Sequence, residues 1–200
     1  MEVQFQKDKV NDNFQKYGDL FQVDLEHFDE FYGLLKERTL KKSEFFLKQG
    51  KKCKHLGFVK SGTLRSFYIN ESGEDQSFNI HSKNQFFTDY ESILNNKTSK
   101  LNIQALRKTE MLLLHKNDLQ KLYLKEAYWQ EFGRKMAERI YLDAIKRIEN
   151  LLYFSAEKRY INLLEESPEI FRNVPQKHIA SYLGITPQSL SRIRRRLQKT

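Results

Sequence analysis

The sequence predicts an α+β protein in which an antiparallel β-roll of the jelly-roll type lies between helical segments. Apolar residues recur every three or four positions up to about residue 38 and again from about residue 116, as in amphipathic helices. Between these segments, residues 42–115 form short runs rich in aromatic and β-branched residues, separated by turn-forming residues. The composition, with 39% hydrophobic and 30% charged residues, is that of a folded globular protein.

Two helices are predicted before the strands. Phe14, Tyr17 and Leu20 recur at a spacing of three and mark the first helix. A second apolar stripe begins after Asp24, whose carboxylate can accept a hydrogen bond from a backbone amide as an N-cap. This stripe extends the predicted helix to about residue 38.

Strands are predicted at 44–47, 55–60, 64–69, 76–80, 86–88, 101–105 and 111–115. Gly50, Gly62 and Gly73 fall in the gaps, where tight reversals require positive φ angles. Short strands at this spacing are typical of a sandwich or jelly roll.

A long helix is predicted at 126–153. A helix of roughly 20 to 25 residues within this segment is on the order of 30 Å or more long. The apolar stripe needs a partner, and either packing on the β-roll or a two-fold, coiled-coil-like contact between two chains can provide one. We favour the dimer contact. The predicted interface residues are Phe132, Met136, Ile140, Ala144 and Ile148.

Positive charge is concentrated at the C-terminal end of the chain. Residues 170–200 contain no Asp or Glu, whereas the net charge of the whole chain is +9. This asymmetry indicates a polyanionic partner, with nucleic acid favoured over a membrane surface. The basic residues of this segment are Arg172, Lys177, Arg192, Arg194, Arg195, Arg196 and Lys199.

The segment 175–197 has the spacing of a helix-turn-helix. Pro175 can occupy the first position of the first helix, Gly184 supplies the turn, and Thr186 caps a second helix that begins at Pro187. A further short helix is predicted at 156–166 with Ser155 as its N-cap. The apolar inner faces of the helix-turn-helix are Ile179 and Leu183 on its first helix and Leu190, Ile193 and Leu197 on its second.

Three outward-facing residues of the second helix, Gln188, Ser189 and Arg192, are predicted to contact DNA bases. Arginine can form two hydrogen bonds with guanine and glutamine two with adenine, and each such pair discriminates by about 1 to 3 kcal/mol. Contacts to DNA phosphates are predicted for Gln176, Lys177, Thr186, Arg194, Arg195, Arg196 and Lys199.

These motifs resemble the Crp/Fnr superfamily, in particular its short members from Bacteroidetes-type bacteria. The similarity lies in HIASYLGITPQSLSRIR at 178–194, SAEKRY at 155–160 and the more degenerate but collinear FVKSGTLR at 58–65. The resemblance implies a cyclic-nucleotide-binding-like β-roll sensor domain at 1–125, a dimerisation helix at 126–153 and a helix-turn-helix DNA-binding domain at 154–200. It also implies a homodimeric transcription regulator that binds double-stranded DNA at a near-palindromic promoter site, with RNA polymerase as a further partner.

The chain departs from the family pattern at the ligand site. The family's cassette pairs Gly-Glu with a downstream Arg-Ser or Arg-Thr, and the corresponding positions here are Thr88-Asp89 and Ser99-Lys100. Without the bidentate arginine–phosphate contact, we expect a degenerate pocket and no response to cyclic AMP; the effector is unknown. The β-hairpin wing beside the recognition helix is expected to be reduced or absent.

Other kinds of site are disfavoured. Cys53 is the only cysteine, which excludes an intramolecular disulfide and a cysteine-held metal cluster. No two histidines are two residues apart, so a cupin-like metalloenzyme with a basic tail is the weaker alternative. No catalytic residue, metal or cofactor is therefore expected, and the β-roll is either a sensor or only a scaffold for constitutive DNA binding. The sequence lacks a membrane-spanning run and a secretory signal, so a cytoplasmic location is expected.

Overall fold

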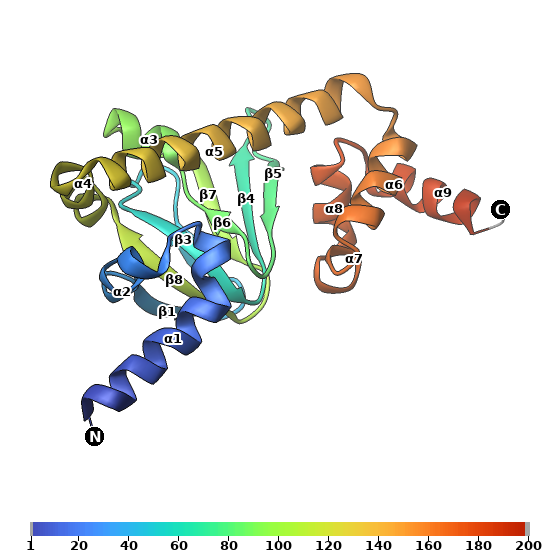
Figure 1. Ribbon diagram of the computed structural model, residues 1–200. Coiled ribbons are helices and arrows are strands. Elements are labelled where there is room, and N and C mark those ends of the chain that lie inside the picture. Colours follow the sequence, from blue (N-terminus) through green and yellow to red (C-terminus); the bar gives the residue numbers. More distant parts are fainter. Residues whose placement is uncertain (1, 199–200) are drawn as a thin grey trace.

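The computed structural model describes residues 2–198 and places a β-roll between N-terminal helices and a C-terminal helical unit (Figure 1). Two antiparallel four-stranded sheets form the roll, which confirms the predicted α+β class. In spatial order, one sheet contains β1 (Lys36–Leu40), β8 (Thr109–His115), β3 (His55–Ser61) and β6 (Phe86–Phe87). The other contains β2 (Phe45–Leu47), β7 (Leu101–Ala105), β4 (Leu64–Ile69) and β5 (Asp75–His81).

Strand β8 contributes to two hydrophobic cores. Met111 and Leu113 pack between the sheets, whereas Leu112 and Leu114 pack against the helices on the outer face of the first sheet. This alternation follows from the two-residue period of a strand. Because both faces of β8 are covered, its sequence is apolar without interruption at 111–114.

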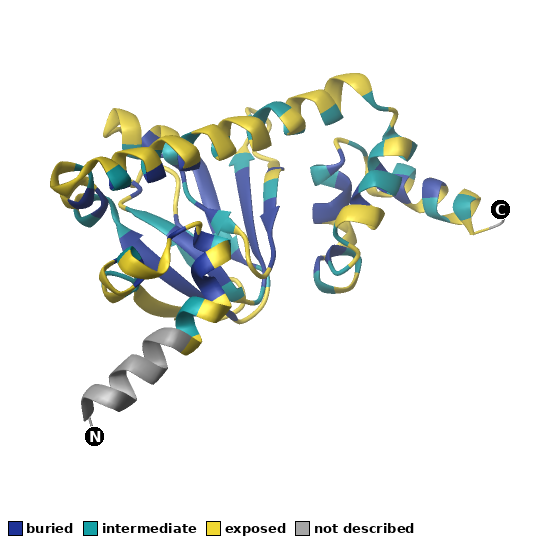
Figure 2. Ribbon diagram, viewed as in Figure 1, coloured by how far each residue is buried: buried dark blue, intermediate teal, exposed yellow. Residues whose placement is uncertain are grey.

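An aromatic cluster joins the helices to the first sheet. Helices α1 (Glu2–Phe21), α2 (Leu25–Gly33) and α5 (Ala127–Tyr153) all contribute to it. Trp129 of α5 is fully buried, and the rings of Phe31 and Phe132 lie 5.4 Å apart between their centroids. The first half of α5 therefore belongs to the core of the β-roll (Figure 2). A short helix, α4 (Lys116–Lys125), precedes it.

Two elements differ from the sequence prediction. The second helix ends at Gly33, and the residues predicted to continue it form strand β1. This strand lies at the edge of its sheet, and of its five residues only Leu40 is buried, so no apolar alternation reveals it. Helix α3 (Tyr90–Asn95) also lies in the segment predicted as strands, and its six residues are too few for a recognisable helical period.

The C-terminal unit consists of α6 (Ala156–Glu166), α7 (Ile170–Asn173), α8 (Gln176–Tyr182) and α9 (Pro187–Leu197). The bounds of α6 match the prediction, and the backbone amide of Lys158 donates to Ser155 Oγ over 3.2 Å, which confirms the predicted cap. Pro175 is the residue before α8 rather than its first helical residue. These helices share a core that includes Tyr160, Ile179, Leu190 and Ile193, together with Ile80 of the β-roll.

Candidate DNA-binding surface

The turn between α8 and α9 has the geometry that a helix-turn-helix needs. Gly184 has a φ angle of +66°, in the left-handed region where a side chain is strained. The amide of Ile185 donates to the carbonyl of Ala180 over 3.0 Å and closes the end of α8. The amide of Ser189 then donates to Thr186 Oγ1 over 3.2 Å, so Thr186 caps α9 as predicted.

Helix α9 is strongly amphipathic. Leu190 and Ile193 are buried, whereas Gln188 and Arg192 are exposed on the opposite side. Ser189 is half-buried, and its hydroxyl accepts a hydrogen bond from Arg192 Nη2 over 3.2 Å. The two long side chains are thus directed away from the protein, while Ser189 helps to orient one of them.

The residues predicted to contact phosphate have diverse surroundings. Gln176 and Lys177 are exposed at the start of α8, and Arg195 is exposed on α9. Arg196 forms an ion pair with Glu157 and thereby joins α9 to α6. Arg194 is half-buried, and the hydroxyl of Thr186 caps α9. The last predicted phosphate contact, Lys199, lies outside the described residues.

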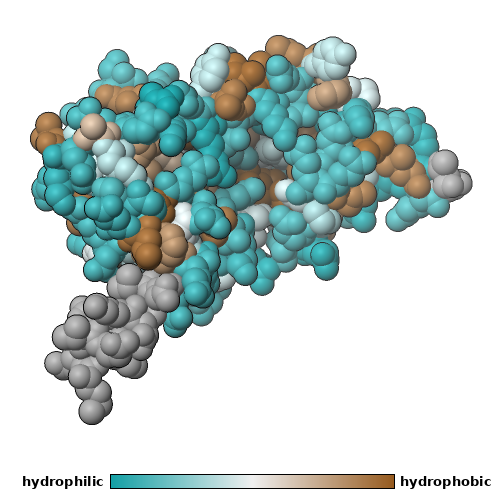
Figure 3. Space-filling view, in the orientation of Figure 1, coloured by the Kyte–Doolittle hydropathy of each residue, from teal (hydrophilic) through white to brown (hydrophobic). Residues whose placement is uncertain are grey.

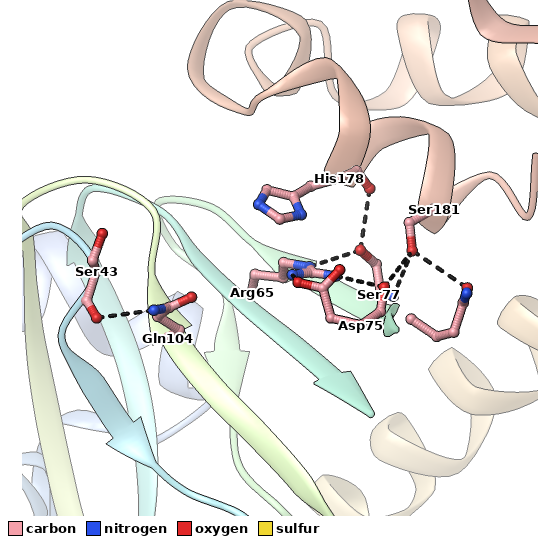
Figure 4. Close-up of polar contacts among 8 residues, drawn as sticks. Ser43, Arg65, Asp75, Ser77, Gln104, His178 and Ser181 are labelled. Carbon is pink, nitrogen blue, oxygen red and sulfur yellow. Dashed lines mark hydrogen bonds and ion pairs between the residues drawn. The ribbon is translucent and has the colours of Figure 1, made fainter. Parts of the chain in front are cut away.

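Helix α8 is hydrogen-bonded to the edge of the β-roll, a contact that the sequence did not predict. The amide of Ser77 in β5 donates to Ser181 Oγ over 2.8 Å, and Ser77 Oγ donates to the carbonyl of His178 over 3.1 Å. Fully buried Arg65 donates to Ser77 Oγ and to the carboxylate of Asp75 (Figure 4). Because β5 is an edge strand, α8 provides partners for groups that its own sheet leaves unpaired.

Two arginines fix the other end of α8. Arg147 of α5 donates to the carbonyl of Tyr182, and its guanidinium lies 4.0 Å from the centre of the Tyr182 ring. Arg159 of α6 donates to the carbonyl of Leu183 over 2.9 Å. These bonds satisfy carbonyl groups that a helix end leaves without partners. The orientation of α8 is therefore set jointly by β5, α5 and α6.

The contact between α8 and β5 leads to a stability prediction. Ser181→Ala leaves the amide of Ser77 without its partner, which we expect to cost about 1 to 3 kcal/mol at this contact. Hydrogen exchange should become faster in β5 and α8, whereas Ser191→Ala on the exposed side of α9 should leave exchange there unchanged. Equal protection of β5 and α8 in both variants would show that the bond does not hold the two units together.

The long helix corrects part of the predicted dimer interface. Phe132 and Met136 are only 6% and 7% exposed and pack in the aromatic cluster of the β-roll, so their assignment to an intersubunit contact is wrong. Ile140 and Ala144 are half-buried, and Ile148 is exposed. Each step of four residues moves the predicted stripe by about 40° around a helix of 3.6 residues per turn. The stripe therefore turns from the β-roll toward solvent along the helix.

The second half of α5 carries exposed apolar residues that lack a partner within the described part of the chain (Figure 3). Tyr141, Ile148 and Leu152 follow one another at spacings of seven and four and share one side of the helix. Ile145 lies between them on the same side and is half-buried. We call these four residues the α5 stripe.

Comparison with known proteins identifies the relatives of the chain. The family described as Cyclic nucleotide-binding domain matches residues 37–126. The transcriptional activator protein Anr of Pseudomonas protegens is 24% identical over 189 residues, which cover 88% of this chain and 77% of Anr. A solved structure described as a transcriptional regulator of the Crp/Fnr family, from Eubacterium rectale, aligns with a TM-score of 0.68 at 18% identity, covering 88% of this chain and 84% of that one. The chain is therefore similar in sequence to a transcriptional activator and shares the fold of a Crp/Fnr-family regulator.

FixK2 from Bradyrhizobium japonicum has the same fold as this chain. The two structures align with a TM-score of 0.70 at 19% identity, over 82% of this chain and 85% of FixK2. Anr is described as a transcriptional activator and the Eubacterium rectale protein as a transcriptional regulator, which argues against the cupin-like alternative. Within residues 2–198, no helix is long and apolar enough to cross a membrane, and among the side chains that the structure describes, those of residues 12–198, no cluster of His, Cys, Asp or Glu could hold a metal ion.

The four positions that the sequence assigns to a degenerate nucleotide cassette are engaged with the protein itself. Thr88 Oγ1 donates to the carbonyl of His55 over 3.0 Å, and Asp89 caps α3 by accepting from the amide of Ser92. Ser99 Oγ donates to the carbonyl of Leu101, and exposed Lys100 lies 3.6 Å from the carboxylate of Glu91. None of the four side chains is a guanidinium that could bind a phosphate in two-point fashion.

Proposed function

We propose that the chain is a dimeric, sequence-specific DNA-binding transcription regulator in which α9 enters the major groove. The observation that carries the proposal is the placement of Gln188 and Arg192 on the exposed side of a helix whose other side is buried. The first turns of a recognition helix meet base edges, and nearby cations meet phosphates. Arg195 and Lys177 are exposed cations suited to the second role.

Two copies of α9 would reach successive major grooves, about 10 base pairs apart, on a near-palindromic promoter site. The α5 stripe is the proposed two-fold contact, because unpartnered apolar residues on one helix face are buried when two such helices pack together. Such a regulator acts in the cytoplasm, with RNA polymerase as its proposed further partner. We also propose that cyclic AMP is not its effector, and calorimetric titration with cyclic AMP tests this.

The role of Arg192 leads to a specificity prediction. Arg192→Ala should relax the preference at one base position per half-site by about 1 to 3 kcal/mol while non-specific binding persists. Selection from random oligonucleotides, followed by affinity measurements on the selected site and its single-base variants, gives this preference. A uniform loss of affinity on all sequences would contradict base contact by Arg192.

Arg195→Ala is the matched control for this experiment. Its side chain is exposed one turn further along α9, and we propose that it contacts a phosphate. The control should weaken binding similarly on all sequences and reduce its dependence on salt.

A further inference from the structure

A hollow of about 330 Å³ lies at the corner of the β-roll where β1, β2 and the start of β3 meet. Its cationic lining consists of Arg38, Lys48, Lys51, Lys52 and Lys54, and its lining contains no Asp or Glu. Strand β8, which pairs with both β1 and β3, leads into α4 on the side of the β-roll away from α8 (Figure 1). The hollow is therefore separate from the proposed DNA-binding surface.

The charges of the hollow are not balanced within the described part of the chain. No carboxylate forms an ion pair with any of the five cations, although exposed lysines elsewhere do so, such as Lys121 with Asp118. Lys52 donates to the neutral side chain of Asn96, and the guanidinium of Arg38 lies 5.8 Å from the centre of the Phe46 ring. Like charges that share a concave surface repel one another and raise the local concentration of anions.

The backbone that carries the lysines is held in place. The loop at 48–54 is hydrogen-bonded to Ser99 just before β7, to α3 and to the start of α4, so the positions from which its lysines project are set by the fold. An anion that binds there orders only the lysine side chains and not the loop backbone. The entropic cost of binding is therefore lower than at a flexible loop. The bonds run from Gly50 N to Ser99 O (2.8 Å), Ser99 N to Lys51 O (2.8 Å), Cys53 N to Ser92 Oγ (3.0 Å) and Lys116 N to Lys54 O (2.9 Å).

The ring of His55 lines the same hollow and reflects its positive potential. Burial lowers the pKa of His55, and the neighbouring charges of His115, Arg38, Lys54 and Lys36 lower it further. The centres of the His55 and His115 rings are 4.9 Å apart. An anion bound among these groups would favour the charged imidazole and raise the pKa of His55.

We propose that this hollow binds a small molecule that carries an oligophosphate group. Five cations around one opening match the several negative charges of linked phosphates better than the single charge of a carboxylate or a phosphodiester. The volume lies at the lower end of the range of about 300 to 1,000 Å³ that is usual for small-molecule pockets. The site is independent of the proposed DNA binding, since it uses none of the residues of α8 or α9.

Titration of the full chain with inorganic tripolyphosphate, followed by NMR at constant ionic strength, tests the proposal. Resonances must be read residue by residue, because the arginines of α9 also attract polyanions. We expect saturable shifts of the Gly50 amide and the His55 ring, with a rise in the pKa of His55. Shifts confined to α9 would overturn the proposal, as would inorganic phosphate saturating the hollow at the same concentration as tripolyphosphate.

A pair of double variants completes the test. Lys51→Gln with Lys54→Gln should weaken the binding seen at Gly50 at least about tenfold, because two charged contacts are lost. Lys83→Gln with Lys108→Gln removes the same charge from exposed positions outside the lining and should leave that binding unchanged. All four lysines are exposed, so the variants should fold, and thermal melting checks this. Equal affinity in the two double variants would overturn the proposal.

Discussion

Replacing both Ile148 and Leu152 with aspartate is expected to separate the dimer and lower affinity for a two-half-site operator at least about a hundredfold. The two side chains are 51% and 83% exposed in the single chain, so the monomer can carry the charges without refolding. In a two-fold contact along α5, the same carboxylates would be buried without partners, at a cost of several kcal/mol. A monomer contacts only one half-site, so it loses the gain in affinity of about 10² to 10⁴ that two linked binding sites provide. Analytical ultracentrifugation and titration of labelled operator DNA measure the two effects.

The matched control for this variant is Leu94→Asp with Leu124→Asp. These leucines of α3 and α4 are 64% and 88% exposed and do not lie on α5. The control adds the same charge and should keep both the dimer mass and the operator affinity. If the Ile148 and Leu152 variant sediments with the mass of the unaltered protein, the α5 stripe is not the dimer contact.

Met136→Asp is expected to unfold the protein rather than to separate a dimer. Met136 packs in the aromatic cluster with Trp129, Phe132 and Phe58, where a carboxylate has no partner. We expect a loss of roughly 4 to 5 kcal/mol or more. That loss is comparable to the total stability of about 5 to 15 kcal/mol of a typical domain. Chemical denaturation followed by tryptophan fluorescence measures it, because the only tryptophan of the chain lies in this cluster.

Met136→Leu provides the comparison, since a swap that preserves volume in a core costs less than about 1.5 kcal/mol. A folded, monomeric Met136→Asp protein with unchanged stability would place this residue in an intersubunit contact, contrary to the structure. Substitution of an apolar residue by aspartate is thus expected to have opposite effects in the two halves of helix α5. The first half supports folding, and the second is available for association.

The order of helices and strands follows from local signals in the sequence. The caps at Asp24, Ser155 and Thr186 and the turn at Gly184 lie where the sequence predicts them, because each depends on residues within one helical turn. Strands β4 and β7 match the predicted ranges, and alternate residues of each, such as Leu64 of β4 and Leu101 and Ile103 of β7, pack in the core between the sheets. The exposed side of α9 was likewise predictable from helical periodicity.

Tertiary structure decided what local signals do not encode. Strand β1 forms because β8 offers it a partner that is distant in the chain, with Lys36 opposite Leu113 and Leu40 opposite Thr109. The β-roll determines which turns of α5 are covered, and the period of a helix is the same whether its apolar side meets its own chain or a second copy. The contact of α8 with β5, the ion pair of Arg196 with Glu157 and the shared positive hollow of Arg38 and Lys51 each join residues from separate elements. Such long-range pairings depend on the packed geometry of the chain, whereas caps, turns and periodicity depend only on neighbouring residues.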